Sequence, residues 1–169
     1  IRKEGNTPAW GAVYEQYFQE IDKVKGQKGV LSVEKKLFVE TNNGTNRQIR
    51  PVTPEQPLRI GDKVIVRLTI RTDREMNYVF LKDLRAGCFE PADQLSGPES
   101  RDGIWYYRSP KDVSENFFIN RLPEGTFVLE YPVYVSRSGE YAGGISTIQC
   151  MYAPEFVSHT AGESLRIMP

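Results

Sequence analysis

The side chains of this sequence that could take part in chemistry are few and far apart. The single histidine, His159, lies among small polar residues, as a surface-loop histidine does. Hydrolysis or group transfer needs a nucleophile beside a base, or metal ligands at a fixed spacing. The sequence shows no HExxH, CxxC, glycine-rich phosphate loop or nucleophile elbow. We therefore expect no enzymatic activity, no metal and no cofactor.

The cysteines and the acidic residues do not change this expectation. Cys88 follows a glycine in a turn and Cys150 lies inside an apolar strand, so we expect two free thiols that act as small hydrophobic side chains. The acidic residues fall mostly in turns, and the sequence selects no acid–base pair among them. An enzymatic interpretation survives only if acidic side chains converge in a pocket.

The charge balance argues against two classes of partner. The 22 Lys and Arg residues equal the 22 Asp and Glu residues, whereas binding to nucleic acid or to an anionic membrane usually needs a basic excess. No apolar run approaches the ~20 residues that cross a bilayer, and no signal peptide is visible. Because the first residue is Ile1 rather than Met, we expect the sequence to be a piece of a longer chain.

Short strands must position these side chains. In residues 31–39, Leu31, Val33, Leu37 and Val39 alternate with polar residues, and Lys35 interrupts the apolar face. Residues 63–71 and 127–135 alternate in the same way, and the charged face of residues 63–71 is typical of a solvated sheet surface. Within 127–135, Pro132 indicates an edge or a bulge.

Turn signals separate these strands. Asn43-Gly44 predicts a hairpin turn, and turns recur at roughly 8–12-residue spacing along the chain. This spacing predicts an all-β fold, an antiparallel immunoglobulin-like β-sandwich from about Gly29 onward.

The first residues differ from the rest. Between residues 10 and 24 the apolar side chains share one helical face, which predicts an amphipathic helix; they are Trp10, Val13, Tyr14, Tyr17, Phe18, Ile21 and Val24. Gly26 and Gly29 then mark a linker.

The stretch Met151 to Phe156 places two aromatic residues around a proline at a strand end. Because proline cannot donate to a sheet ladder, we expect the chain to leave the sheet at Pro154, with Tyr152 and Phe156 projecting outward as a pair. From the residues alone, Tyr152 also fits a core tyrosine whose hydroxyl bonds to the backbone.

Three stretches together resemble a known family: "WGAVYEQYF", "LRAGCFEPADQLSG", and the run from "GIWYYRS" through "LPEGT", "EYPVYV" and "MYAPE". In this order they are similar to the C-terminal end of bacterial alpha-2-macroglobulin family proteins, especially the large ones of Bacteroides-type bacteria. The resemblance covers most of the chain. Gly87-Cys88-Phe89 departs from the Ala-Gly-Phe that is more usual there, which argues against a required role for Cys88.

The resemblance implies a domain division and a parent protein. Residues 29–169 would be a β-sandwich of macroglobulin type, and residues 1–28 would be the tail of a preceding CUB-like domain plus a linker, which makes residues 10–18 a strand rather than a helix. The parent would be a large protein of the periplasm or cell envelope that traps or blocks proteases. The partners of this chain would be neighbouring domains and, through the parent, the target proteases.

The resemblance also suggests a role for the aromatic stretch. Some family members carry a reactive thioester built from a Cys-Gly-Glu-Gln motif in another domain, and the terminal domain shields it with an aromatic loop. This chain has no such motif, but "MYAPE" is similar to that loop. Tyr152, Pro154 and Phe156 are therefore the candidates for domain contact or thioester shielding, and Tyr152 should be exposed, with a hydroxyl that lacks a partner in this chain.

A second interpretation stays open. The chain would then be an autonomous immunoglobulin-like module that binds protein or glycan through exposed aromatic side chains such as Trp105, Tyr106 and Tyr107. An exposed aromatic patch on a sheet face, bordered by polar side chains, would favour it.

Overall fold

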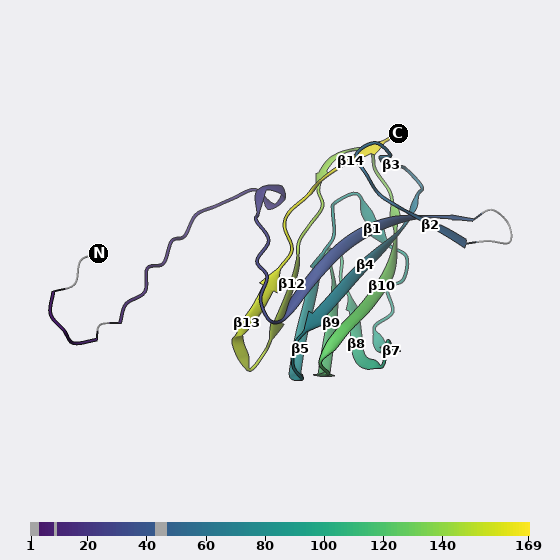
Figure 1. Cartoon of the computed structure of the whole chain (residues 1–169). Coiled ribbons are helices and arrows are strands. Elements are labelled where there is room, and N and C mark those ends of the chain that lie inside the picture. The colour runs from purple at the N-terminus through teal and green to yellow at the C-terminus, as the bar shows by residue number, and fades with distance from the viewer. Residues whose placement is uncertain (1–3, 9, 43–46) are drawn as a thin grey trace.

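The fold is a β-sandwich built from antiparallel sheets, in a computed structural model that describes residues 4–8, 10–42 and 47–169 (Figure 1). One large sheet has six strands, in the order β13 (Ala153–His159), β12 (Ser146–Cys150), β5 (Met76–Leu84), β9 (Ser114–Leu122), β8 (Ile104–Pro110) and β7 (Gly97–Arg101). The other has five, in the order β2 (Arg47–Pro51), β1 (Ser32–Asn42), β4 (Lys63–Thr72), β10 (Gly125–Val135) and β6 (Phe89–Pro91). The predicted fold class is confirmed.

A small third sheet lies at one end of the sandwich. It contains β11 (Gly139–Ala142), β14 (Ser164–Met168) and β3 (Leu58–Arg59), and β14 pairs with β3 in parallel. Figure 1 shows β14 and β3 together at the end where the chain terminates.

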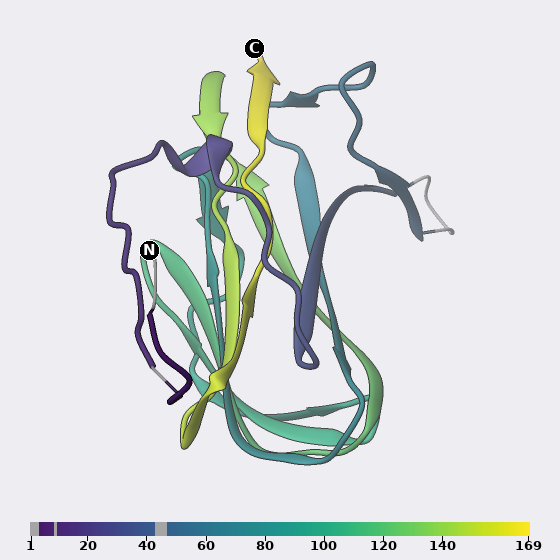
Figure 2. The same ribbon diagram turned by 60° about the vertical axis from the view of Figure 1, so that its left-hand side comes forward.

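The alternating residues meet between the two large sheets. In β4, Val66 lies opposite Leu37 of β1 and Tyr131 of β10, so the inward side chains of three adjacent strands form continuous rows. These rows pack against inward side chains of the six-stranded sheet such as Leu81 and Ile119. Figure 2 shows the two layers from the side, with blue β1 in one and yellow-green β12 and β13 in the other.

The segment before the sandwich is neither the predicted helix nor the strand implied by the family resemblance. Residues 10–20 have no regular secondary structure, and only Ile21–Lys23 form a short 3-10 turn. Figure 1 shows this segment extending away from the sheets, and its Trp10 side chain is 96% exposed. An isolated amphipathic helix depends on burial of its apolar stripe, and these aromatic side chains have nothing to pack against.

The linker, in contrast, is tied to the sandwich. The amide of Gly162 donates to the carbonyl of Val24 at 2.8 Å, and Gln27 pairs with His159 in an antiparallel bridge. A Cβ atom at position 162 would lie 1.7 Å from the carbonyl oxygen of Ile21, so this crossing requires glycine. The direction in which the chain enters the sandwich is therefore fixed by backbone contacts.

Three smaller expectations have different outcomes. The turn predicted at Asn43-Gly44 lies outside the described residues. Pro132 lies inside β10, and its carbonyl accepts from the amide of Ala92 on the β6 side, so the missing N–H faces that side and interrupts no bond to β4. Among the described residues, no helix has the length and apolar character needed to span a bilayer.

Candidate functional site

The aromatic stretch forms the tip of a tight hairpin. Met151 and Tyr152 make the turn between β12 and β13, where Cys150 lies opposite Ala153. The side chain of Tyr152 is 80% exposed, and its hydroxyl has no hydrogen-bond partner within the described part of the chain. The exposure expected for Tyr152 is present, while its role in domain contact stays a prediction.

A second tyrosine supports this tip from below. The ring of Tyr152 packs edge-on against the ring of Tyr78 in β5, with 5.2 Å between the ring centroids. The amide of Met151 donates to the carbonyl of Tyr78 at 2.9 Å. Because a backbone hydrogen bond and a ring contact both join the hairpin to β5, the side chain of Tyr152 is restricted to one orientation.

Tyr78 itself has an unusual backbone. Its φ angle is 56°, a left-handed conformation that bulky side chains rarely adopt. The ladder to β9 pairs Asn77 with Arg121 and Val79 with Ile119 in one unbroken register, and Tyr78 itself is the residue between them that is not paired. Backbone strain of this kind is concentrated at functional sites and costs about 1–3 kcal/mol.

The predicted pairing of Tyr152 with Phe156 is wrong. Phe156 is half-buried and packs against the core, and the guanidinium of Arg74 lies 5.8 Å from its ring centroid. The aromatic partner of Tyr152 is Tyr78, which comes from a strand far away in the sequence.

The chain also does not leave the sheet at Pro154. The register passes from Gln149 opposite Val157 to Cys150 opposite Ala153, so Pro154, Glu155 and Phe156 form a bulge, and pairing resumes beyond it. Proline is tolerated here because β13 is the edge strand of its sheet.

More aromatic side chains cover the outer side of the six-stranded sheet. Tyr107, Phe118 and Phe80 lie directly opposite one another on β8, β9 and β5, and the rings of Phe80 and Phe118 stack with centroids 4.9 Å apart. Trp105 precedes them on β8 and is 71% exposed. We call this set, with the hairpin pair, the outer aromatic face: Tyr78, Phe80, Trp105, Tyr107, Phe118 and Tyr152.

One aromatic residue proposed for the alternative binding surface does not belong to it. Tyr106 points into the sandwich, where its hydroxyl donates to Glu99 at 3.0 Å and burial raises its pKa to about 12. Alternation along β8 places Trp105 and Tyr107 outside and Tyr106 inside, so the three cannot share one surface.

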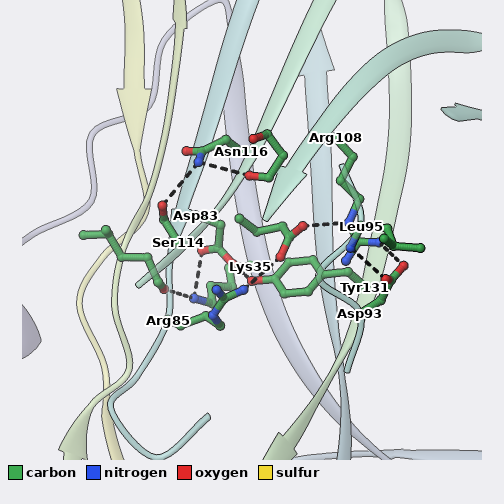
Figure 3. A network of polar contacts seen from close by, with 12 residues as sticks. Lys35, Asp83, Arg85, Asp93, Leu95, Arg108, Ser114, Asn116 and Tyr131 are labelled. Atoms are coloured by element: carbon green, nitrogen blue, oxygen red, sulfur yellow. Dashed lines mark hydrogen bonds and ion pairs between the residues drawn. The ribbon is translucent and has the colours of Figure 1, made fainter. Parts of the chain in front are cut away.

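The interior holds a polar cluster that the sequence did not reveal (Figure 3). The carboxylate of Asp83 is fully buried and accepts from the Lys35 ammonium at 2.8 Å, from the Ser146 hydroxyl at 2.7 Å, and from the Tyr131 hydroxyl. Burial, together with the charge of Asp83, raises the pKa of Tyr131 well above its ordinary value. Tyr131 therefore stays a neutral donor.

A second buried carboxylate lies beside the first. Glu115 faces Asp83 in register across β5 and β9, and it accepts from Arg108 at 2.6 Å and from Arg85 at 2.8 Å. Burial raises the pKa of Glu115, against the opposing effect of the two guanidinium groups. Three guanidinium nitrogens of the two arginines have no partner within the described residues, namely Arg85 Nε, Arg85 Nη2 and Arg108 Nη2.

This cluster is not built like a hydrolytic site. Asp83 and Glu115 come together as an acidic pair, but both are sealed from solvent and each is held by cations. His159 lies elsewhere: it is the half-buried last residue of β13, paired with Gln27 of the linker, rather than the expected surface-loop residue, and its Nδ1 lies 3.1 Å from the Thr160 carbonyl. Within the described residues, no group of three or more His, Cys, Asp or Glu side chains is placed to hold a metal.

The two cysteines are free and buried on different elements. Cys88 precedes β6, and Cys150 ends β12 with its thiol donating to the Asn77 carbonyl. Burial raises the pKa of Cys88 to about 11, so its thiol is not ionised at neutral pH.

The sequence contains signals for two members of the interior cluster that were not predicted as site residues. Lys35 breaks the apolar face of β1, and Asp83 follows Val79 and Leu81 on the inward face of β5. A charged residue at an inward position indicates a buried partner. No signal identified the left-handed Tyr78 as the support of Tyr152.

Comparison with known families gives one match that covers most of the chain. A family model described as bacterial alpha-2-macroglobulin MG10 domain matches residues 31–155. That range runs from the start of β1 past the hairpin tip, so it contains both the outer aromatic face and the interior cluster.

Solved structures with the same fold belong to bacterial alpha-2-macroglobulins. A tyrosine-to-glycine mutant from Salmonella has a TM-score of 0.67 and 21% identity, over 86% of this chain and 10% of that chain. Escherichia coli alpha-2-macroglobulin activated by porcine elastase has a TM-score of 0.67 and 18% identity, over 86% of this chain and 14% of that chain. At these identities the likeness shows the fold alone.

One curated relative is also similar. Circularly permutated Ras protein 2 of Dictyostelium discoideum is 28% identical over 109 residues, which is 64% of this chain and 3% of that protein. This chain therefore spans only a small part of the relative and of both structures.

Proposed function

Because the chain belongs to the family of bacterial alpha-2-macroglobulin MG10 domains, we propose that it is a non-enzymatic domain of a large protease-inhibiting parent, which it serves by docking against a neighbouring domain. The docking surface is the outer aromatic face. The parent acts in the periplasm or cell envelope, and proteases are its targets.

The size of the similar proteins supports a neighbouring domain as the occupant. The chain covers 10% and 14% of the two structures, so most of such a parent lies outside it. The linker is fixed to the sandwich at Gly162 and Gln27, beside the edge strand β13, and the preceding chain enters next to the six-stranded sheet. A domain placed there would lie close to the outer aromatic face.

The observation that carries the proposal is the geometry of the hairpin tip. A tyrosine that is 80% exposed normally has many conformations available, whereas Tyr152 is braced by the Tyr78 ring and by the bond from Met151 to Tyr78. Such preorganisation lowers the entropy cost of binding. Tyrosine and tryptophan are also the residues most often found at the energetic centre of interfaces.

The rest of the face continues this surface. Phe80 and Phe118 extend the aromatic row across β5 and β9 toward Trp105 and Tyr107 on β8. Exposed apolar patches rimmed by polar side chains mark protein interaction sites. Contact with the parent would bury the row and the hairpin tip together.

A finer role follows if the parent carries a thioester. Tyr152 would then cover the thioester and slow its hydrolysis by water, as the family resemblance of "MYAPE" implies. The exposed ring and the unpaired hydroxyl of Tyr152 are compatible with a contact that lies outside this chain.

The alternative is an autonomous module that binds an external protein or glycan. The exposure of Trp105 and Tyr107 on one rigid sheet face favours it. The two functions differ in the intact parent: a domain contact hides these side chains there, whereas a module for external ligands keeps them exposed.

The experiment is a substitution in the intact parent. We expect Tyr152→Ala to loosen the domain contact by up to ~30-fold, because a central aromatic anchor contributes about 2 kcal/mol. Limited proteolysis at the linker reports the loosening and, if a thioester is present, so does its rate of hydrolysis. Tyr134→Ala is the control, since Tyr134 is also an exposed tyrosine, at 45%, but lies on the five-stranded sheet away from the outer aromatic face. Equal protease sensitivity of both variants and the wild type would contradict the proposal.

A further inference from the structure

A lysine and an aspartate join the two sheets inside the sandwich. Lys35 stands at an inward position of β1 and its side chain is 10% exposed, while Asp83 of β5 is fully buried in the opposite sheet. The Lys35 Nζ atom lies 2.8 Å from Asp83 Oδ1. Figure 3 shows the two side chains pointing toward each other. Neither residue belongs to the outer aromatic face, and docking assigns no role to the pair.

Holding this pair as ions is costly. Removing an ammonium and a carboxylate from water carries a desolvation penalty for each ion, which their mutual attraction and their other hydrogen bonds must offset. An amide between the same two side chains contains no ionised group and keeps the contact between the sheets.

We propose that Lys35 and Asp83 condense in the folded chain to an isopeptide bond that joins β1 to β5. The bond forms between Nζ of Lys35 and the carboxyl carbon of Asp83. One water molecule leaves, so the reaction needs no oxidant, reductant or activated co-reactant.

The atoms balance within the pair. The ammonium first passes one proton to the carboxylate, and the neutral amine then attacks the carboxyl carbon. Oδ1 leaves as water with two of the three original ammonium protons, and Oδ2 remains as the amide oxygen. The third proton stays on the amide nitrogen, where the Leu84 carbonyl at 2.9 Å is available to accept it.

The neighbouring groups are placed to assist this reaction. The Tyr131 hydroxyl donates to Oδ2, the oxygen on which negative charge develops during attack, and such preorganised donors stabilise tetrahedral intermediates. The Ser146 hydroxyl donates to Oδ1, the oxygen that leaves. Tertiary structure holds the reactants together, which gives effective molarities of up to ~10⁵–10⁸ M in well-oriented systems.

The released water also has a way out. A cavity of ≈ 550 Å³ lies beside Lys35 and is lined in addition by Gly143, Thr160 and Glu163. Asp83 itself is fully buried, so its carboxylate contacts the amine of Lys35 and not bulk water.

The cross-link would restrain the unfolded chain and hold the two sheets together, as a disulfide does in other sandwiches.

The test is the intact mass of the denatured 169-residue chain after purification and overnight incubation in the folded state. We expect a mass about 18 Da below that of the sequence, the mass of one water. Tryptic digestion should yield a branched peptide that contains both Lys35 and Asp83, without cleavage after Lys35. A mass equal to that of the sequence would overturn the proposal, whatever the variants do.

Lys35→Arg is the control, because it keeps the positive charge but cannot form this amide. We expect this variant to have its full sequence mass. Asp102-Gly103 could lose a water of its own by closing to a succinimide, and that loss would persist in Lys35→Arg. A loss that persists in the variant, or maps to residues 102–103, would overturn the cross-link.

Discussion

The two outer surfaces of the sandwich differ in whether their side chains have interaction partners within the chain. On the five-stranded sheet, Glu130 of β10 accepts from Arg67 of β4 and from Arg101, which reaches over from the end of β7, each at 2.6 Å. Lys63 donates to Glu40 at 2.9 Å. We call this surface the charged outer face. Its long side chains find their partners within the described chain.

The outer aromatic face is different. Its exposed rings contact one another, as Tyr152 contacts Tyr78 and Phe80 contacts Phe118, but they leave most of the area of Trp105 and Tyr152 in water. Burying such area is favourable by about 25 cal/mol per Å². A further partner therefore has little to gain on the charged outer face and much to gain on the aromatic one.

The largest effect is expected from removing two aromatic anchors in the intact parent. Trp105→Ala combined with Tyr107→Ala should weaken docking by more than ~30-fold, because such anchors contribute about 2 kcal/mol or more at interface centres. Cross-linking yield between this domain and its neighbour measures the change. Equal loss of yield for Tyr134→Ala, on the charged outer face, would remove the distinction between the two surfaces.

A smaller effect is expected from a substitution on the charged outer face, measured in the isolated chain. Glu130→Gln should lower the free energy of unfolding by about 1 kcal/mol, since it weakens two charge-assisted bonds whose arginines are partly exposed. Chemical denaturation monitored by tryptophan fluorescence measures this change. The same substitution should leave docking in the parent unaltered, and weaker docking would mean that the charged outer face also contacts a partner.

The charged outer face should also respond to pH. Although burial acts in the other direction, the bonds from Arg67 and Arg101 hold the pKa of Glu130 below its ordinary value. Glu130 therefore stabilises the fold above the ordinary glutamate pKa of ~4.3, and this contribution is lost as pH falls through the lowered value. The difference in unfolding free energy between wild type and Glu130→Gln should shrink over that acid range. A difference that is constant with pH would contradict the assignment.

The smallest effect is expected for Trp105→Ala alone in the isolated chain. Because the side chain is 71% exposed, its loss should change the free energy of unfolding by less than ~0.5 kcal/mol. Thermal unfolding followed by circular dichroism is sufficient to measure it. A loss of more than ~1 kcal/mol would show that Trp105 stabilises the fold and is not reserved for a partner.

The strands could be predicted from the sequence because their signal is local. Alternation in residues 31–39, 63–71 and 127–135 depends only on neighbouring side chains, and it correctly separates the charged outer face from the core. The same local reasoning failed for residues 10–20, where the apolar stripe of a helix has no surface to cover.

The candidate site could be predicted only in part, because its partners are distant in the sequence. "MYAPE" located the exposed Tyr152, but the ring that supports it comes from β5. The pairing of Lys35 with Asp83 spans 48 residues, and nothing in the pattern of either strand selects the other. Pro154 is likewise compatible with strand pairing because β13 is an edge strand. Whether a strand lies at the edge depends on the order of the strands in the sheet, which the local sequence does not reveal.

Hydroxyl-radical footprinting tests the central claim most directly, because it measures the solvent exposure of individual aromatic side chains. The isolated chain and the intact parent are oxidised under the same conditions, and the modified residues are quantified by mass spectrometry. The account predicts that Trp105, Tyr107 and Tyr152 are oxidised in the isolated chain and protected several-fold in the parent, while Tyr134 is oxidised equally in both. Equal oxidation of Trp105, Tyr107 and Tyr152 in chain and parent would contradict docking through the outer aromatic face.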